Sequence, residues 1–263
     1  MGEPKADCGG GLEVQGVEVA FGPIHALRGL DLALAPGEQV AFVGPSGAGK
    51  TTLLQLLGAR RRPSSGSVCV EGRRVSDLSG VELRRQRSRI AFVHQDLRLV
   101  PNVRVLQNVL AGRLGQWSLG RSVVHLLRPS RDLVAEVYGL LERVGIPEKL
   151  YQRTDSLSGG QQQRVAVARA LFQKPTALLA DEPVSSVDPA RARETVKLLT
   201  EVCEERGLTL AMSLHDLELA RTFFPRLVGL RHGRKVFDQA PDDLDAEAFR
   251  ALYDLDRAPP GGS

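Results

Sequence analysis

Apolar and polar positions in the first third of the chain follow the two-residue period of β-strands. The segments 14–19 and 29–34 alternate roughly in this way, as expected for strands with one buried face. Pro36 and Gly37 mark a turn before the short, mostly apolar run 39–43. The pattern therefore predicts a strand-rich N-terminal region that leads into a buried strand.

Beyond this region, helical spacing alternates with short apolar runs. Helical spacing indicates helices over residues 51–57, 105–110, 133–144, 161–172 and 190–206. Apolar runs indicate further buried strands at residues 68–70, 89–93, 177–180 and 208–212. Strands that alternate with helices predict a parallel α/β sheet, interrupted here by a helical insertion. The basic stretch 112–130 fits neither period clearly.

Length and composition place the chain among ordinary globular proteins. It has 263 residues, of which 42% are hydrophobic and 25% charged. No run of about 18 apolar residues is present, so no transmembrane helix is expected and any membrane crossing needs another chain. Residues 1–11 lack the apolar stretch of a signal peptide, which favours a cytosolic location.

Charge and cysteine content add little to this picture. The net charge is +4, and aromatic residues make up only 5% of the chain, so nucleic acid is not an expected partner. The arginines between residues 84 and 89 are interpreted as a solvated helix end. Cys8, Cys69 and Cys203 fit no metal-site spacing and are expected to be reduced thiols.

The strongest chemical motif follows the buried strand 39–43. It fits the phosphate-binding pattern G-x-x-x-x-G-K-[ST] and consists of Gly44, Pro45, Ser46, Gly47, Ala48, Gly49, Lys50 and Thr51, with Thr52 next in the chain. Glycines let the backbone approach phosphates, and amides at a helix start attract anions. Lys50 can reach the terminal phosphates, and Thr51 is the expected Mg²⁺ ligand. A glycine-rich turn that merely starts a helix is the alternative, which the Lys-Thr pair disfavours.

Two acidic residues end the apolar run 177–180. Ligands of open α/β sheets bind beyond the carboxyl ends of the strands. There, Asp181 can hold Mg²⁺ directly or through water, and Glu182 can orient or deprotonate an attacking water. An acid that caps the next helix is the alternative, and the phosphate loop at 44–51 favours the catalytic interpretation.

A second glycine motif precedes the helix predicted at 161–172. Ser158, Gly159, Gly160 and Gln161 offer a second anion site at a helix N-terminus, although an ordinary serine cap would look the same. Two phosphate sites in one chain are explained if one nucleotide lies between two copies. This hypothesis predicts a dimer that closes around nucleotide.

The three motifs together resemble the ATP-binding subunit of ATP-binding-cassette (ABC) transporters over residues 12–255. The resemblance implies an α/β fold of the P-loop ABC type, with a RecA-like parallel-sheet core, an N-terminal antiparallel β region and a helical subdomain. It implies an ATP-binding core at 12–96 and 161–255 and a helical subdomain at 97–160 that ends in the signature motif. Residues 1–11 and 256–263 would be flexible ends.

Further site residues are expected from this resemblance alone. Phe21 stands where the family has an aromatic residue that stacks on adenine, and its alternative is a core aromatic. Gln95 matches a glutamine that contacts Mg²⁺, although it could be a plain surface residue. Residues 185–188 match the loop that crosses the dimer interface, unless Asp188 simply caps a helix. His215 matches the histidine that holds the γ-phosphate.

The mechanism implied by the family is ATP hydrolysis in a head-to-tail homodimer at the cytoplasmic face of the cell membrane. Lys50 and the loop amides would hold ATP and its Mg²⁺, Ser158 and Gly160 of the second subunit would contact the γ-phosphate, and Glu182 would polarise water. The implied partners are a membrane-spanning permease and, indirectly, a periplasmic or lipid-anchored binding protein.

Two segments, 107–118 and 149–153, are similar to the ATPase subunit of phosphonate importers, and importers of phosphate or phosphite would look nearly the same. The segment 94–101 departs from that group and is closer to cassettes of cell-division and lipoprotein-release complexes. Import of a phosphonate or related oxyanion is therefore the first hypothesis, and a regulatory or lipoprotein-release ATPase is the alternative.

Overall fold

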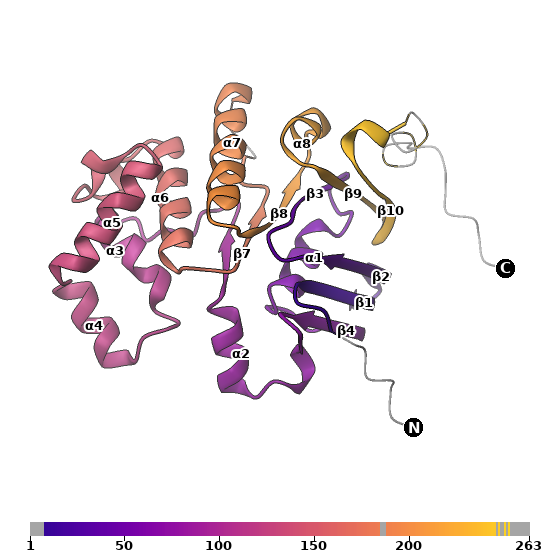
Figure 1. The fold of residues 1–263 in the computed structure, drawn as a ribbon, viewed down its shortest axis with the longest axis horizontal. Helices are drawn as coiled ribbons and strands as arrows, with labels where there is room; N and C mark the ends of the chain where they lie inside the picture. The colour runs from indigo at the N-terminus through magenta and orange to yellow at the C-terminus, as the bar shows by residue number, and fades with distance from the viewer. Residues whose placement is uncertain (1–7, 185–187, 246, 248–249, 251, 253–263) are drawn as a thin grey trace.

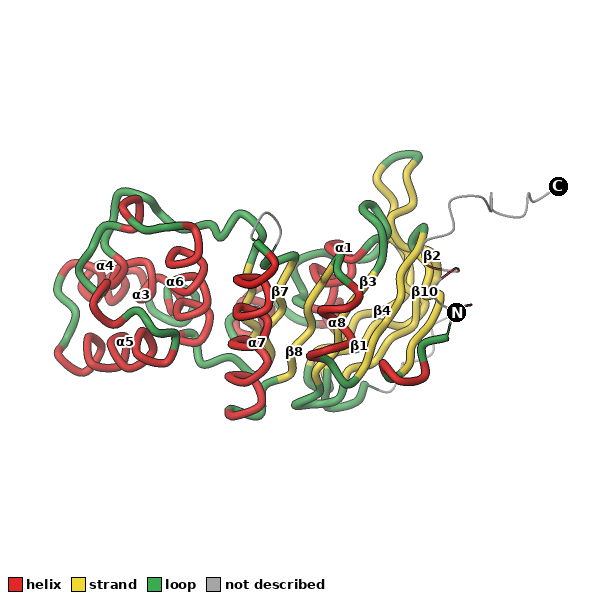
Figure 2. Tube along the Cα trace, turned by 90° about the horizontal axis from the view of Figure 1, so that it is seen from above, coloured by secondary structure: helices red, strands yellow, loops and turns green. Residues whose placement is uncertain are grey.

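A computed structural model of the chain describes residues 8–184, 188–245, 247, 250 and 252 (Figure 1). Two β-sheets with their covering helices occupy one side of the molecule, and a group of helices occupies the other. Figure 2 shows α7 (Pro189–Glu205) at the boundary between the two parts. This arrangement confirms the predicted α/β class, with an antiparallel N-terminal sheet, a mainly parallel core sheet and a helical region.

The core sheet has six strands in the order β10-β9-β3-β8-β7-β6. Their bounds are β3 (Gln39–Val43), β6 (Ile90–Val93), β7 (Ala177–Asp181), β8 (Thr209–Leu214), β9 (Arg226–Arg231) and β10 (Arg234–Gln239). All neighbouring pairs are parallel except β9 and β10. The carboxyl ends of β3, β7 and β8 therefore meet at one edge, where the motif residues follow.

The second sheet is antiparallel, in the order β2-β1-β4-β5. Its strands are β1 (Leu12–Phe21), β2 (Ile24–Leu34), β4 (Ser65–Val70) and β5 (Arg73–Arg74). Residues such as Leu30 and Leu32 are buried, whereas their sequence neighbours in β2, residues 29, 31 and 33, are exposed. One face of this sheet thus closes a core with α1 (Lys50–Leu57), as the alternating pattern predicts.

Two hydrophobic cores lie on opposite faces of the six-stranded sheet. Alternate residues of β3 belong to different cores: Val40 and Phe42 pack with α1, whereas Ala41 and Val43 pack on the other face. The second core includes residues of α7 and α8 (Leu217–Phe223). A strand that is buried on both faces reads as a continuous apolar run, which is why the core strands could be located from the sequence.

The helical region lies between β6 and β7 in the chain. It contains α3 (Val105–Leu110), α4 (Leu119–Leu127), α5 (Arg131–Arg143) and α6 (Gly159–Phe172). A further helix, α2 (Gly80–Arg87), precedes β6. Short 3₁₀ turns occupy Val75–Asp77, Ala111–Arg113, Pro147–Lys149, Thr154–Ser156 and Pro241–Asp243. The basic stretch that the periodicity left unassigned thus contains α4.

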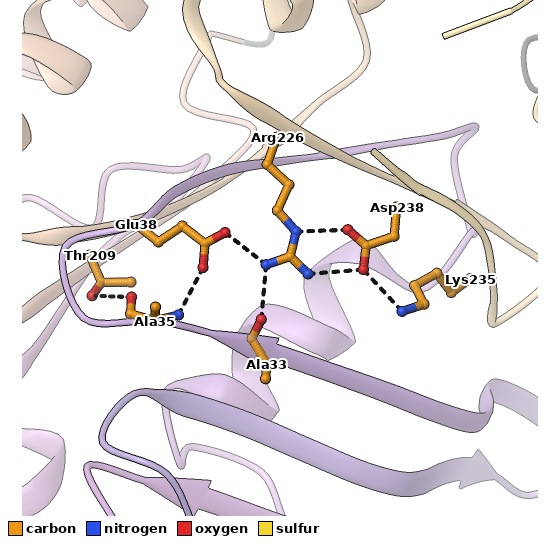
Figure 3. A network of polar contacts seen from close by, with 7 residues as sticks. All are labelled: Ala33, Ala35, Glu38, Thr209, Arg226, Lys235 and Asp238. Atoms are coloured by element: carbon orange, nitrogen blue, oxygen red, sulfur yellow. Dashed lines mark hydrogen bonds and ion pairs between the residues drawn. The ribbon is translucent and has the colours of Figure 1, made fainter. Parts of the chain in front are cut away.

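Arg226 of β9 joins the two sheets (Figure 3). Its guanidinium donates to both carboxylate oxygens of Asp238 at 2.7 and 2.9 Å, to Glu38 at 2.8 Å and to the carbonyl of Ala33 at 3.0 Å. Burial alone would raise the pKa of Asp238, but hydrogen bonds from Arg226 and Lys235 lower it. The network fixes the β9–β10 hairpin against the β2–β3 connection.

One cysteine expectation is wrong. Cys8 and Cys69 form a disulfide, with Cα atoms 5.8 Å apart, whereas Cys203 is free and buried. The chain before β1 runs beside the end of β4, where the Glu71 amide donates to the Gly11 carbonyl. The structure thus brings together two thiols that are 61 residues apart in sequence, a pairing that their spacing does not reveal. Within the described residues, no helix has the length and apolarity needed to cross a membrane.

Candidate nucleotide-binding site

The loop between β3 and α1 adopts a backbone path that only glycine tolerates at two positions. Gly49 has a φ of 107°, and a Cβ there would lie 2.6 Å from the carbonyl oxygen of Ala26. Gly44 has a φ of 149°, and its Cβ would lie 2.1 Å from the carbonyl oxygen of Leu230. The loop is therefore held tightly between β2 and β9, and it leads directly into the N-terminus of α1.

Lys50 lies inside this loop with 4% of its surface exposed. Its ammonium group donates to the carbonyls of Gly44 at 2.8 Å and Pro45 at 3.1 Å, and it lies 3.6 Å from a carboxylate oxygen of Glu182. Burial lowers the pKa of Lys50, while the charge of Glu182 and its hydrogen bond act to raise it. The structure therefore places a buried cation next to the acid predicted to be catalytic.

Asp181 ends β7 and faces the first turn of α1. Its Oδ1 accepts hydrogen bonds from Thr51 Oγ1 at 3.0 Å and from Ser213 Oγ at 2.8 Å. Burial raises the pKa of Asp181, and these two hydrogen bonds act to lower it. The structure therefore brings together Asp181 and Thr51, two of the three predicted Mg²⁺ ligands.

Gln95 shares a cavity of about 490 Å³ with both of these residues. The lining also includes Gln55, His94, Asp96 and Arg98. The described residues contain no group of three or more His, Cys, Asp or Glu side chains that could hold a metal ion. The hydroxyl, carboxylate and amide oxygens present suit Mg²⁺ that is bound together with phosphate oxygens.

Glu182 is fixed from two directions. One of its carboxylate oxygens lies 2.6 Å from Nε2 of His215, which follows β8. Its backbone amide donates to Ser213 Oγ at 2.8 Å, and its φ is 45°, a value that non-glycine residues adopt at a cost of about 1–3 kcal/mol. The strained backbone directs the carboxylate between Lys50 and His215, so the predicted base, histidine and lysine are neighbours.

Ser213 is the main site residue that sequence reasoning missed. It is fully buried in β8 and lies opposite Asp181 in the register of β7 and β8. Its hydroxyl donates to Asp181 and accepts from the amide of Glu182, and so links the two acids. The signal available in the sequence was a serine within a mostly apolar strand that was predicted to lie in the same sheet as the strand ending in Asp181.

Arg169 on α6 is a second residue that the sequence did not single out. Its guanidinium donates to the carbonyl oxygens of Leu97 at 2.5 Å and Arg98 at 2.6 Å. Both of these loop residues have positive φ, 53° and 46°. Arg169 therefore connects the loop that carries Gln95 to the helix that begins with the signature motif.

The signature residues form the start of α6. Ser158 Oγ accepts from the Gln161 amide, and the Gln161 side chain accepts from the Ser158 amide, which completes a capping box. Ser158 and Gly159 are exposed, and Gly160 is half-buried. In Figures 1 and 2, α6 and α1 stand apart with β7 between them, so this chain does not bring the signature to its own phosphate loop.

Two further predicted site residues, Phe21 and Asp188, make contacts outside the cluster of Lys50, Asp181 and Glu182. Phe21 ends β1 with 43% of its surface exposed, and the Arg61 guanidinium lies 4.5 Å from the centre of its ring. Asp188 caps α7 by accepting from the Arg191 amide at 3.0 Å, which is the alternative interpretation of this residue. The other residues of its predicted interface loop, 185–187, lie outside the described part of the chain.

Comparison with known proteins assigns the chain to a family. The chain matches the ABC transporter family over residues 27–185. It is 47% identical over 230 residues to the phosphonates import ATP-binding protein PhnC of Pseudomonas fluorescens, covering 88% of this chain and 86% of that protein. It is 43% identical over 243 residues to the corresponding PhnC protein of Thiobacillus denitrificans, covering 92% of both.

Solved structures of ATP-binding cassettes share the fold of this chain. The cbiO1 protein of Clostridium perfringens, part of the ABC transporter complex cbiONQ, superposes with a TM-score of 0.76 at 28% identity, covering 88% of this chain and 89% of that one. A dimeric ATP-binding cassette in a post-hydrolysis state, bound to ADP and Pi, gives a TM-score of 0.74 at 30% identity, covering 88% and 98%.

Proposed function

This chain belongs to the ABC transporter family and is an ATPase, and from this membership we propose that it powers the import of a phosphonate or a related oxyanion. The observation that carries the proposal is the 47% identity, over most of both chains, to proteins named as phosphonate import ATP-binding subunits. The polar site described above suits ATP and is not assigned to the transported solute. The solute would therefore be selected by other chains of the transporter.

ATP binding is assigned to the loop 44–51 and the residues around it. Loop amides and the start of α1 would hold the phosphates, and Lys50 would exchange its loop carbonyl partners for the terminal phosphates. Phe21 would stack on adenine from the tip of β1. Mg²⁺, held through Thr51, Asp181 and Gln95, would neutralise charge on the phosphates.

Glu182 would position the attacking water and accept its proton. Its carboxylate lies between Lys50 Nζ and His215 Nε2, and its amide is held by Ser213, so the side chain has little freedom to turn away. His215 would stabilise charge on the γ-phosphate. Catalysis in this arrangement rests on positioning and electrostatics without a covalent protein intermediate.

A second copy of the chain would complete each site. The exposed signature residues at the start of α6 would meet a partner; the position of β7 between α6 and α1 in the same chain supports this. Ser158 and Gly160 would contact the γ-phosphate bound by the other copy, and Asp188 would lie at their interface. The dimer would associate with a membrane-spanning permease at the cytoplasmic face of the membrane, and a periplasmic or lipid-anchored binding protein would deliver the solute.

The test is reconstitution of the complex that co-purifies with the tagged chain in mild detergent. We expect a multi-span permease, and ATP hydrolysis that rises when a phosphonate-loaded binding protein is added. Glu182→Gln is the matched control, because it should retain ATP binding and lose turnover. Recovery of a few-span partner, with turnover insensitive to phosphonate, phosphate and phosphite, would reject import and favour a regulatory or lipoprotein-release role.

A further inference from the structure

The helix α4 presents an apolar stripe to solvent. Leu119, Val123, Val124 and Leu127 are 84%, 49%, 58% and 76% exposed. Positions 119, 123 and 127 repeat every four residues, so they line one face of the helix, and position 124 widens it. The helix is attached to the rest of the protein through buried Ser122 and half-buried Leu126, which lie beside the stripe. Four aliphatic side chains on one short helix thus remain uncovered in this chain.

All aspartate, glutamate, lysine and arginine positions in the surrounding segment are arginines. Residues 97–131 contain six arginines and no aspartate or glutamate. Arg121, Arg128 and Arg131 are exposed, and within the described residues no carboxylate forms an ion pair with any of them. Arg121 lies in the first turn of α4 and Arg128 is its C-terminal cap, so both arginines belong to the segment that carries the stripe. The surface therefore suits a partner that is both apolar and negatively charged.

The position of α4 favours a flat partner. In Figure 1, α4 lies at the lower outer corner of the helical region, and α2 reaches the same lower edge of the molecule. The exposed side chains of α2 include Arg84, Arg85 and Arg87. A flat partner along this edge would come near both the helix with the apolar stripe and the exposed arginines of α2. A protruding helix of this kind suits a membrane surface better than it suits the groove of another protein.

We propose that α4 binds the surface of an anionic lipid bilayer, with its aliphatic stripe among the acyl chains and its arginines at the headgroups. Amphipathic helices with these two features lie in the plane of the membrane interface. This contact would add to the one with a permease, and it does not depend on the solute that the transporter carries. It would also orient the chain, because α4 and α2 would face the membrane together.

The test uses the purified full-length chain in vesicle flotation. The probes are vesicles of phosphatidylcholine alone and vesicles in which half of the lipid is phosphatidylglycerol. We expect binding only to the anionic vesicles and weaker binding as salt is raised. Arg121→Gln with Arg128→Gln should weaken binding by about fivefold for each arginine, and Leu119→Gln with Leu127→Gln should abolish it.

The controls separate this surface from general charge and from misfolding. Arg234→Gln with Val236→Gln removes one exposed arginine and one exposed aliphatic residue from β10 and should leave flotation unchanged. All variants should keep the native unfolding temperature and ATP hydrolysis. Absence of flotation with anionic vesicles, equal flotation of the α4 variants, or binding that requires a permease in the vesicle would each overturn the proposal. Because ATP hydrolysis is measured on the same samples, failure of the lipid proposal is distinguishable from failure of the proposed function.

Discussion

Ser213 offers the sharpest test of how the site is built, because one buried hydroxyl supports both acidic residues. It donates to Asp181 Oδ1 at 2.8 Å and accepts from the Glu182 amide at 2.8 Å, and none of its surface is exposed. Ser213→Ala removes both bonds with almost no change in volume. Water cannot replace the hydroxyl easily at a fully buried position, so the two former partners should stay unsatisfied.

The size of the effect follows from the two bonds. A hydrogen bond to a carboxylate contributes about 1.5–3 kcal/mol and one to a neutral amide about 1 kcal/mol, so the free energy of unfolding should fall by about 2–4 kcal/mol. For a chain of this size that lowers the unfolding temperature by about 5–15 °C. Turnover should fall by about 10- to 100-fold, because Glu182 loses the bond that holds its strained backbone.

The assay combines thermal unfolding with ATP affinity and turnover. Thr200→Val is the matched control: its hydroxyl is also buried, but it donates only to carbonyls of its own helix, α7, so its loss should cost less than about 1 kcal/mol. ATP affinity of Ser213→Ala should change little, since Lys50 and the loop amides remain. If Ser213→Ala matches Thr200→Val in both stability and turnover, the assigned link between the acids is wrong.

Three further predictions concern the signature, the loop that carries Gln95, and pH. Ser158→Arg should spare ATP binding by one chain and block ATP-dependent dimerisation, as measured by gel filtration; a normal dimer with full turnover would contradict the two-copy site. Arg169→Gln should free the carbonyls of residues 97–98, lower stability by about 1–3 kcal/mol and increase proteolysis within this loop, and an unchanged cleavage pattern would refute the connection. Burial, with the charges of Arg98 and Arg60, lowers the pKa of His94 from 6.5 to about 4. The unfolded chain therefore binds this proton first, so stability should fall as pH drops from 6.5 towards 4, and His94→Gln should flatten that fall in denaturant titrations; identical pH profiles would exclude His94 as the cause.

The phosphate loop and the acidic strand end could be located in the sequence because each depends on local order. The glycines, lysine and threonine at 44–51 act through the backbone of one turn, and Asp181 and Glu182 follow directly from an apolar strand. Parallel strands bring their carboxyl ends to one edge, so finding these motifs after predicted strands was enough to expect them side by side. Their contacts in the structure, such as that of Thr51 with Asp181, agree with this expectation.

Residues that act through contacts between distant segments could not be recognised in the same way. The role of Ser213 depends on the register of β8 against β7, and that of Arg169 on how α6 packs against the loop at 97–98. The same is true of the disulfide between Cys8 and Cys69, which rests on the path of the chain before β1. In the sequence, Ser213, Arg169 and the two cysteines are isolated residues that belong to no recognisable motif.

The sequence by itself therefore determined the fold class and the positions of the glycine-rich loop and of the two acids after β7, because hydrophobic period and short motifs are properties of neighbouring residues. The tertiary structure alone decided which side chains support those acids, that the signature helix α6 lies apart from the loop of its own chain, and that the stripe of α4 stays uncovered. Burial and register depend on how distant segments pack, and no local pattern of residues specifies them.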